Sequence, residues 1–171
     1  MIVLLGYMGV GKSSVSKQLA NALGCKFIDL DDYIEDREKK SIQAIFKQKG
    51  EIYFRTIEHR YLKELLCSKA YDIIALGGGT PCYANNMDLI NSGNHQSFYL
   101  KMNLDSLTDR LFQIKENRPL ISHISNMQEL KDFVRKHLFE RQFYYQQAKH
   151  TIDVSKLTVG EMTHTILDHL K

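Results

Sequence analysis

An octapeptide near the start of the chain, GYMGVGKS at residues 6–13, combines three glycines with a lysine and a hydroxyl side chain. It follows the apolar run IVLL and precedes a segment of helical period, which is the context that the pattern G-x-x-x-x-G-K-[ST] requires. Glycines let the backbone curl so that its N–H groups face phosphate oxygens, and the helix N-terminus adds partial positive charge. Lys12 is expected to reach the β- and γ-phosphates, and Ser13 to ligate Mg²⁺. The motif therefore predicts a nucleotide-binding P-loop rather than an empty glycine turn.

Two aspartates, Asp29 and Asp31, follow the next apolar run in the segment FIDLDDYIE. Spaced two residues apart, they are expected on the same side of an extended segment. Facing phosphates, one carboxylate can hold the water shell of a metal while the other takes a proton from an attacking hydroxyl. A helix N-cap followed by an acidic first turn gives the same pattern. Beside a P-loop, the catalytic interpretation is the stronger one.

Arg55 and Glu58 lie three residues apart in the predicted helix that contains YFRTIE. At this spacing the carboxylate can hold the guanidinium, and an arginine so fixed can present a fork to a substrate carboxylate. The alternative is an ordinary surface ion pair. Further on, Gly77, Gly78 and Gly79 end an apolar run, where missing side chains let a ligand approach the backbone. A sharp turn without a ligand is the alternative for this triplet.

The elements that must position these residues follow from hydrophobic periodicity. Segments of helical period alternate with short apolar runs, at residues 2–5, 26–30, 72–76, 97–101 and 150–154. Strands separated by helices pair in parallel, so the chain predicts an α/β fold of three layers, α/β/α, around a five-stranded parallel sheet. Segments 6–13, 29–35 and 77–82 all follow strands and are expected to meet at the carboxyl edge of that sheet.

A chain of 171 residues with a net charge of +3 predicts one domain, residues 1–171, and a monomer. The basic residues are dispersed among acidic ones, which favours a small anionic ligand over a nucleic acid. The three cysteines, Cys25, Cys67 and Cys82, show no metal-ligand spacing, and Cys82 is interpreted as a bystander thiol. Reduced thiols, no charged leader and no run of about 20 apolar residues predict a cytoplasmic protein that does not enter membranes.

The segment QIKENRPLISHISN, around Pro119, breaks the helical period between two helical stretches. A helix does not run through this proline, so a loop of about a dozen residues is expected. We interpret residues 115–125 as a mobile lid.

In order, and over nearly the whole chain, these motifs resemble those of the shikimate kinases, a P-loop family of the nucleoside-monophosphate-kinase-like group. The resemblance implies ATP-dependent phosphorylation of the 3-hydroxyl of shikimate with Mg²⁺, on the route to chorismate and the aromatic amino acids. A sibling kinase for gluconate or a nucleoside monophosphate would not need Arg55 and Arg141 in this arrangement. A nucleotide-binding module without catalysis is disfavoured because Lys12, Ser13 and both aspartates are intact.

The same resemblance assigns roles to residues. Asp29 supports Mg²⁺ together with Ser13, and Asp31 contacts the shikimate hydroxyls and is the candidate base. Arg55 and Arg141, the latter in ERQFYY, clamp the substrate carboxylate, while Arg118 in ENRPLI closes over the transferring phosphate. The resemblance places the remaining residues at ATP (Gly9, Val10, Gly11, Lys12, Ser13, Ser14, Arg110) and at shikimate (Gly77, Gly78, Gly79).

The family often has a proline before a tyrosine that follows the second carboxylate arginine, whereas this chain reads QFYY. Tyr144 or Tyr145 is therefore the counterpart of that tyrosine. Spacing favours Tyr145.

Overall fold

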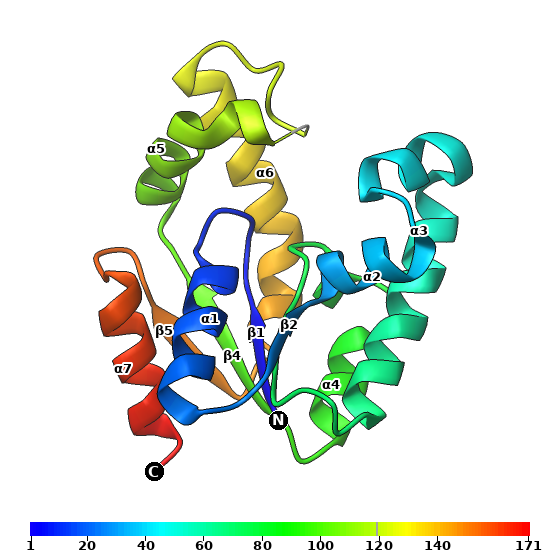
Figure 1. Cartoon of the computed structure of the whole chain (residues 1–171). Coiled ribbons are helices and arrows are strands. Elements are labelled where there is room, and N and C mark those ends of the chain that lie inside the picture. Colours follow the sequence, from blue (N-terminus) through cyan, green and yellow to red (C-terminus); the bar gives the residue numbers. More distant parts are fainter. Residues whose placement is uncertain (119) are drawn as a thin grey trace.

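A computed structural model describes residues 1–118 and 120–171, so Pro119 of the predicted lid lies outside the described residues. The described part contains one parallel sheet with strand order β2-β3-β1-β4-β5 (Figure 1). Its strands are β1 (Ile2–Leu5), β2 (Phe27–Asp29), β3 (Ile73–Ala75), β4 (Gln96–Lys101) and β5 (His150–Asp153). Each falls on one of the apolar runs, which confirms the predicted sheet.

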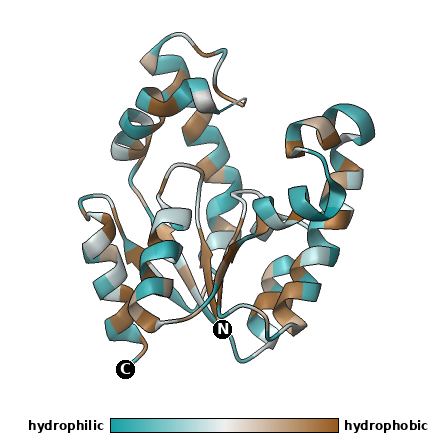
Figure 2. Ribbon diagram, in the orientation of Figure 1, coloured by the Kyte–Doolittle hydropathy of each residue, from teal (hydrophilic) through white to brown (hydrophobic). Residues whose placement is uncertain are grey.

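The central strands are apolar because both of their faces are covered. Every residue of β1 and β3 is buried, and Figure 2 shows β1 as a continuous hydrophobic segment. A strand buried on both faces has no reason to alternate polar and apolar residues. The rigid, fully packed centre of the sheet is what carries the P-loop at the end of β1.

Helices complete the three layers. α1 and α7 pack together over one face of the sheet, and α6 lies behind the other face (Figure 1). The described helices are α1 (Lys12–Leu23), α2 (Leu30–Glu38), α3 (Ile42–Cys67), α4 (Asn86–Ser92), α5 (Leu104–Ile114), α6 (Met127–Tyr145) and α7 (Val159–His169), with single 3₁₀ turns η1 (Thr80–Cys82) and η2 (Lys115–Asn117). Within residues 1–118 and 120–171, no helix combines the length and apolar character needed to cross a membrane.

Two lobes rise on either side of the carboxyl edge of the sheet (Figure 1). One is formed by α2 and α3, which pack against each other, and the other by α5 and α6. Helix α3 is kinked at Gly50, whose φ of 80° and ψ of 175° are not helical. The kink separates a first segment from the part of α3 that carries Arg55 and Glu58.

Two local expectations need correction. Strand β2 ends at Asp29, and Asp31 lies in the first turn of α2, so the two aspartates do not share an extended segment. The lid segment is not irregular throughout, because it begins with η2 and continues in hydrogen-bonded turns. Ile121 and Ile124 are buried and fasten its second half to the core. The sequence of this segment lacks a helical period because turns have no simple hydrophobic repeat.

Candidate active site

The P-loop backbone has the left-handed conformations that its glycines allow. Gly6, Gly9 and Gly11 have φ values of 141°, 84° and 101°, which side-chain-bearing residues rarely adopt. A Cβ on Gly6 would lie 2.7 Å from the carbonyl oxygen of Leu100, and one on Gly9 would lie 2.7 Å from the side chain of Leu111. Gly11 then caps α1, so the loop leads directly into a helix N-terminus suited to phosphate.

Lys12 is buried against the loop that it serves. Its Nζ donates to the carbonyl oxygens of Gly6 and Tyr7, at 2.9 Å each. Burial lowers the pKa of Lys12 to about 8, although the carboxylates of Asp29 and Asp31 act in the opposite direction. An ammonium desolvated in this way interacts strongly with an incoming phosphate.

Ser13, Asp29 and Asp31 form a chain of contacts at the start of α1 and α2. The Ser13 hydroxyl donates to Oδ2 of Asp29 at 2.6 Å, and Oδ1 of Asp29 accepts from the backbone N–H of Asp31 at 3.1 Å. Asp29 is thus the N-cap of α2 while its carboxylate lies beside the P-loop hydroxyl. The capping and catalytic interpretations of this acidic segment are compatible.

Asp31, the predicted base, has a strongly shifted pKa. Its pKa is raised to about 7, first by burial and then by the carboxylates of Asp29 and Glu58. A base with a pKa near neutrality both exists ionised and holds a proton well. Its Oδ1 lies 2.8 Å from the position that a Cβ on Gly77 would occupy, so it points at the start of the glycine triplet.

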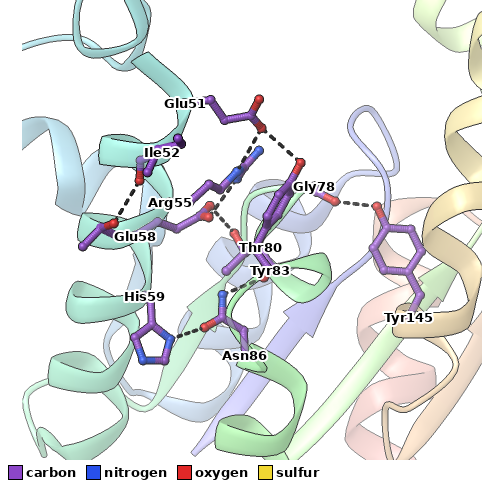
Figure 3. A network of polar contacts seen from close by, with 11 residues as sticks. Glu51, Ile52, Arg55, Glu58, His59, Gly78, Thr80, Tyr83, Asn86 and Tyr145 are labelled. Carbon is purple, nitrogen blue, oxygen red and sulfur yellow. Dashed lines mark hydrogen bonds and ion pairs between the residues drawn. The ribbon is translucent and has the colours of Figure 1, made fainter. Parts of the chain in front are cut away.

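Arg55 is fixed by a buried carboxylate. Its Nη1 donates to Oε2 of Glu58 at 2.8 Å, while Oε1 of Glu58 accepts from the Thr80 hydroxyl at 2.7 Å (Figure 3). The Glu58 side chain is 1% exposed, which excludes the interpretation as a surface ion pair. Nη2 of Arg55 lies 2.8 Å from where a Cβ on Gly79 would be. The guanidinium therefore faces the end of the glycine triplet.

The glycine triplet is needed for space rather than for unusual backbone angles. None of Gly77, Gly78 and Gly79, all described residues, is among the glycines with positive φ. A Cβ on Gly78 would lie 3.2 Å from the backbone nitrogen of Met8 in the P-loop. The hydroxyl of Tyr145 donates to the Gly78 carbonyl at 2.5 Å (Figure 3). The triplet thus joins the P-loop, the acidic pair and the arginine helix.

Arg141, on α6, approaches the same loop from the other side. Its guanidinium carbon lies 5.5 Å from the centroid of the buried Tyr7 ring. Burial raises the pKa of the Cys82 thiol to about 11, and the charges of Arg141 and Arg55 both act on it in the opposite direction. A raised pKa keeps this thiol protonated near neutral pH, and the interpretation of Cys82 as a bystander stays a prediction.

A cavity of about 310 Å³ lies on the P-loop side of the site. Arg110 reaches it from α5, with Nη1 3.5 Å from the carbonyl oxygen of Val10, and the exposed Arg118 lies at its rim. Arg118 also acts electrostatically on Lys12. The lining consists of Met8, Gly9, Gly11, Lys12, Ser13, Ser14, Asp29, Asp31, Leu76, Gly77, Gly78, Arg110, Ile114 and Arg118. Most predicted ATP-site residues thus meet here, whereas Arg55 and Arg141 are not among these lining residues and lie near η1.

Several contacts were not anticipated from the sequence. Thr80 completes the support of the Glu58 carboxylate and could have been suspected because it directly follows the glycines. Tyr83 places its ring 4.1 Å from the guanidinium carbon of Arg55, and no motif or spacing pointed to it. Tyr145 is fully buried at the glycine triplet, whereas Tyr144 is 36% exposed. The tyrosine favoured from spacing is the one that reaches this loop.

A P-loop at the end of a central parallel strand, an acidic pair beside it and a nearby arginine held by a buried carboxylate are the arrangement of a P-loop kinase for a small acceptor. The family model described as shikimate kinase matches residues 8–171. A shikimate kinase of Flavobacterium johnsoniae is 49% identical, covering 99% of this chain and 98% of that protein. The structure of a shikimate kinase from Bacteroides thetaiotaomicron is 32% identical with a TM-score of 0.90, covering 99% of this chain and 97% of that one. A shikimate kinase from Acinetobacter baumannii in complex with shikimate is also 32% identical, with a TM-score of 0.86, covering 99% and 91%.

The chain belongs to the shikimate kinase family. The family expected from the motifs is confirmed, and with it the enzymatic class: an ATP-dependent transferase of aromatic amino acid biosynthesis.

Proposed function

We propose that this site transfers the γ-phosphoryl group of ATP to the 3-hydroxyl of shikimate, giving shikimate 3-phosphate and ADP. The observation that carries the proposal is the glycine triplet. The candidate base Asp31 lies at Gly77, its first residue, and the guanidinium of Arg55 lies at Gly79, its last. A base and a carboxylate receptor at the two ends of a three-residue segment suit a small hydroxy acid. Because the glycines carry no side chains, the ring of such an acid can approach their backbone between the two groups.

In this proposal, catalysis is mostly positioning and charge neutralisation, because phosphoryl transfer passes through a loose transition state. Lys12 exchanges its loop carbonyls for phosphate oxygens, and Arg118 approaches the same charge from the lid. Asp31 orients the acceptor hydroxyl and takes its proton. Arg55 and Arg141 hold the acceptor carboxylate, while Arg110 lies over the nucleotide base.

The donor set beside the P-loop fits Mg²⁺. Ser13 and Asp29 offer hard oxygen ligands within 2.6 Å of each other. Within the described residues, no group of three or more His, Cys, Asp or Glu side chains gathers as a metal site. Mg²⁺ commonly binds through one or two protein oxygens, water and substrate phosphates, so this sparse set suits it. When bound, the ion would neutralise charge developing on the β- and γ-phosphates.

We further propose that residues 1–171 act as one domain and a monomer in the cytoplasm. The three cysteines are free thiols, as a reducing compartment would keep them.

An acceptor comparison tests the function. ADP release is measured with shikimate, quinate, gluconate and nucleoside monophosphates, with and without Mg²⁺. Turnover is expected with shikimate and Mg²⁺, and much less with the other acceptors. Equal turnover with gluconate or a nucleoside monophosphate would contradict the proposed acceptor.

A further inference from the structure

The Arg55 guanidinium is held by more than its buried carboxylate partner. Its carbon lies 4.1 Å from the centroid of the Tyr83 ring and 5.1 Å from that of Phe54. Its Nε donates to Glu51 at 3.4 Å, a long contact with a half-exposed carboxylate. Among the described residues Nη2 meets no acceptor, and this nitrogen faces Gly79. One nitrogen is therefore presented to a ligand while neighbours restrain the rest of the group.

Tyr83 stands in a loop that is tied down on both sides. The buried Asn86 donates from Nδ2 to the carbonyl oxygen of Thr80 at 2.7 Å, and its Oδ1 pairs with Nδ1 of His59 at 2.7 Å (Figure 3). The backbone N–H of Asn86 also donates to the carbonyl oxygen of Tyr83 at 2.9 Å. These contacts fasten the loop to α3.

The backbone after Tyr83 adopts a rarely populated conformation. Ala84 and Asn85 have φ values of 50° and 55°, in the left-handed region. Such a conformation costs roughly 1 to 2 kcal/mol for an ordinary residue, and it persists only where the surroundings impose it. The loop is thus held in a definite shape directly behind the tyrosine that covers Arg55.

A triangle of contacts links the tyrosine to the arginine. The Tyr83 hydroxyl donates to Oε1 of Glu51 at 3.0 Å, and the same oxygen accepts from Nε of Arg55 (Figure 3). A cavity of about 530 Å³ opens beside this triangle, and both Arg55 and Tyr83 line it. Without the Tyr83 ring, the guanidinium would have open space into which to turn.

We propose that Tyr83 is a positioning residue for Arg55, holding the guanidinium so that Nη2 meets the carboxylate of the acid substrate. The proposal rests on the proposed role of Arg55. A receptor group that its neighbours already fix loses less conformational freedom when it binds. An aromatic ring over a partly desolvated guanidinium provides that restraint. If Tyr83 only packed against α3, its removal would affect stability and not the recognition of a carboxylate.

The test compares shikimate with its carboxamide analogue in calorimetric titrations of the unmodified protein, Tyr83→Leu and Tyr83→Phe. Tyr83→Leu is expected to weaken binding of the acid about tenfold, in line with the upper range of cation–π contacts, and binding of the amide less than about twofold. Tyr83→Phe keeps the ring and is expected to retain most of the affinity for the acid. The kcat and the KM for ATP should change little, because Tyr83 does not line the nucleotide cavity.

Tyr53→Leu is the matched control. Tyr53 is 37% exposed, as is Tyr83, and its hydroxyl donates to Glu38 at 3.1 Å. A cation, Lys49, also lies over its ring, at 5.8 Å. It therefore has the same kinds of contact without Arg55, and its loss should leave the binding of both ligands unchanged.

Equal weakening of acid and amide by Tyr83→Leu, or no weakening, would overturn the inference while leaving the role of Arg55 intact. If the unmodified protein bound acid and amide alike, Arg55 would not read a carboxylate and both proposals would fall. Should Tyr83→Leu not fold, Tyr83→Met replaces it, because methionine keeps an apolar side chain of similar length without the ring. The same selective loss for the acid is then expected, and no selective loss overturns the inference.

Discussion

The hydroxyl of Tyr145 donates a hydrogen bond to the carbonyl oxygen of Gly78, joining α6 to the glycine triplet. Tyr145 is fully buried, whereas Gly78 is half-buried and lines the cavity of about 310 Å³, so Tyr145→Phe leaves that carbonyl without its protein partner at the edge of the cavity. We expect the free energy of unfolding to fall by about 0.5 to 1.5 kcal/mol. The KM for shikimate should rise as well, because α6 also carries Arg141.

Urea unfolding and steady-state kinetics measure the two effects. Tyr144→Phe is the control, since Tyr144 is 36% exposed and should change stability by less than about 0.5 kcal/mol. Equal stabilities of Tyr145→Phe and the unmodified protein would show that the hydrogen bond contributes nothing.

Gly79→Ala tests whether the triplet provides space for Arg55. The new Cβ would lie 2.8 Å from Nη2, so the guanidinium must move out of its position. We expect the KM for shikimate to rise at least about tenfold, in keeping with the cost of displacing a positioned group, while the KM for ATP is nearly unchanged. Gly160→Ala, in α7, is the control, because its Cβ would meet nothing nearer than 3.8 Å. An unchanged KM for shikimate in Gly79→Ala would mean that Arg55 does not act from its observed position.

The sheet and the P-loop could be predicted from the sequence because their signals are local. A buried strand is an apolar run, and the P-loop is a contiguous pattern of glycines followed by lysine and serine. The contacts that hold Arg55 could not be predicted in this way. Tyr83 meets it only because loop 80–86 folds back on α3, and no spacing along the chain encodes that approach. The expectation that Asp29 and Asp31 share one side of an extended segment is also wrong, because a helix begins directly after the strand ends.

Asp31→Asn is expected to have opposite effects on activity and on the stability of the metal-free protein. The pKa of Asp31 is raised to about 7, chiefly by burial, whereas an aspartate in an unfolded chain has a pKa of about 3.9. The folded state therefore holds the proton more tightly. Its stability falls as pH rises from about 4 through about 7, where the buried carboxylate ionises.

Asparagine resembles the protonated form, so Asp31→Asn should be more stable than the unmodified protein at pH 8, by on the order of 1 kcal/mol, and similar to it at pH 4. Thermal unfolding with a chelator at the two pH values measures this difference. The kcat should fall about 100-fold or more through loss of the base. A stability difference independent of pH would contradict the raised pKa, and a near-normal kcat would remove Asp31 from the role of base.

The lid prediction concerns Arg118. Charge on the transferring group is largest in the transition state, so Arg118→Ala should lower kcat about 100-fold and change the KM for shikimate by less than about threefold. Amide hydrogen exchange across residues 115–125 should slow when ADP and shikimate are added together. The buried Ile121 and Ile124 should already be protected without ligands. Unchanged exchange around Arg118 would argue against closure, and a normal kcat would argue against its catalytic role.

Replacing Arg55 or Arg141 by lysine should weaken shikimate binding in both cases but should change the stability of the protein by different amounts. A lysine ammonium cannot reproduce the planar guanidinium, which at Arg55 donates from Nη1 to Glu58 and keeps Nη2 facing Gly79, so both variants should bind shikimate about 30-fold or more weakly, with ATP affinity retained. Their stabilities should differ. Arg55→Lys leaves Glu58, which is 1% exposed, with the Thr80 hydroxyl as its remaining neutral donor, and should cost about 1 to 2 kcal/mol. Arg141 packs over the Tyr7 ring, and a lysine there keeps a cation near that ring, so Arg141→Lys should cost less than about 0.5 kcal/mol. Calorimetry measures the affinity of each variant for shikimate and for ATP, and urea unfolding measures its stability. Equal losses of stability in the two variants would show that the buried Glu58 does not depend on Arg55.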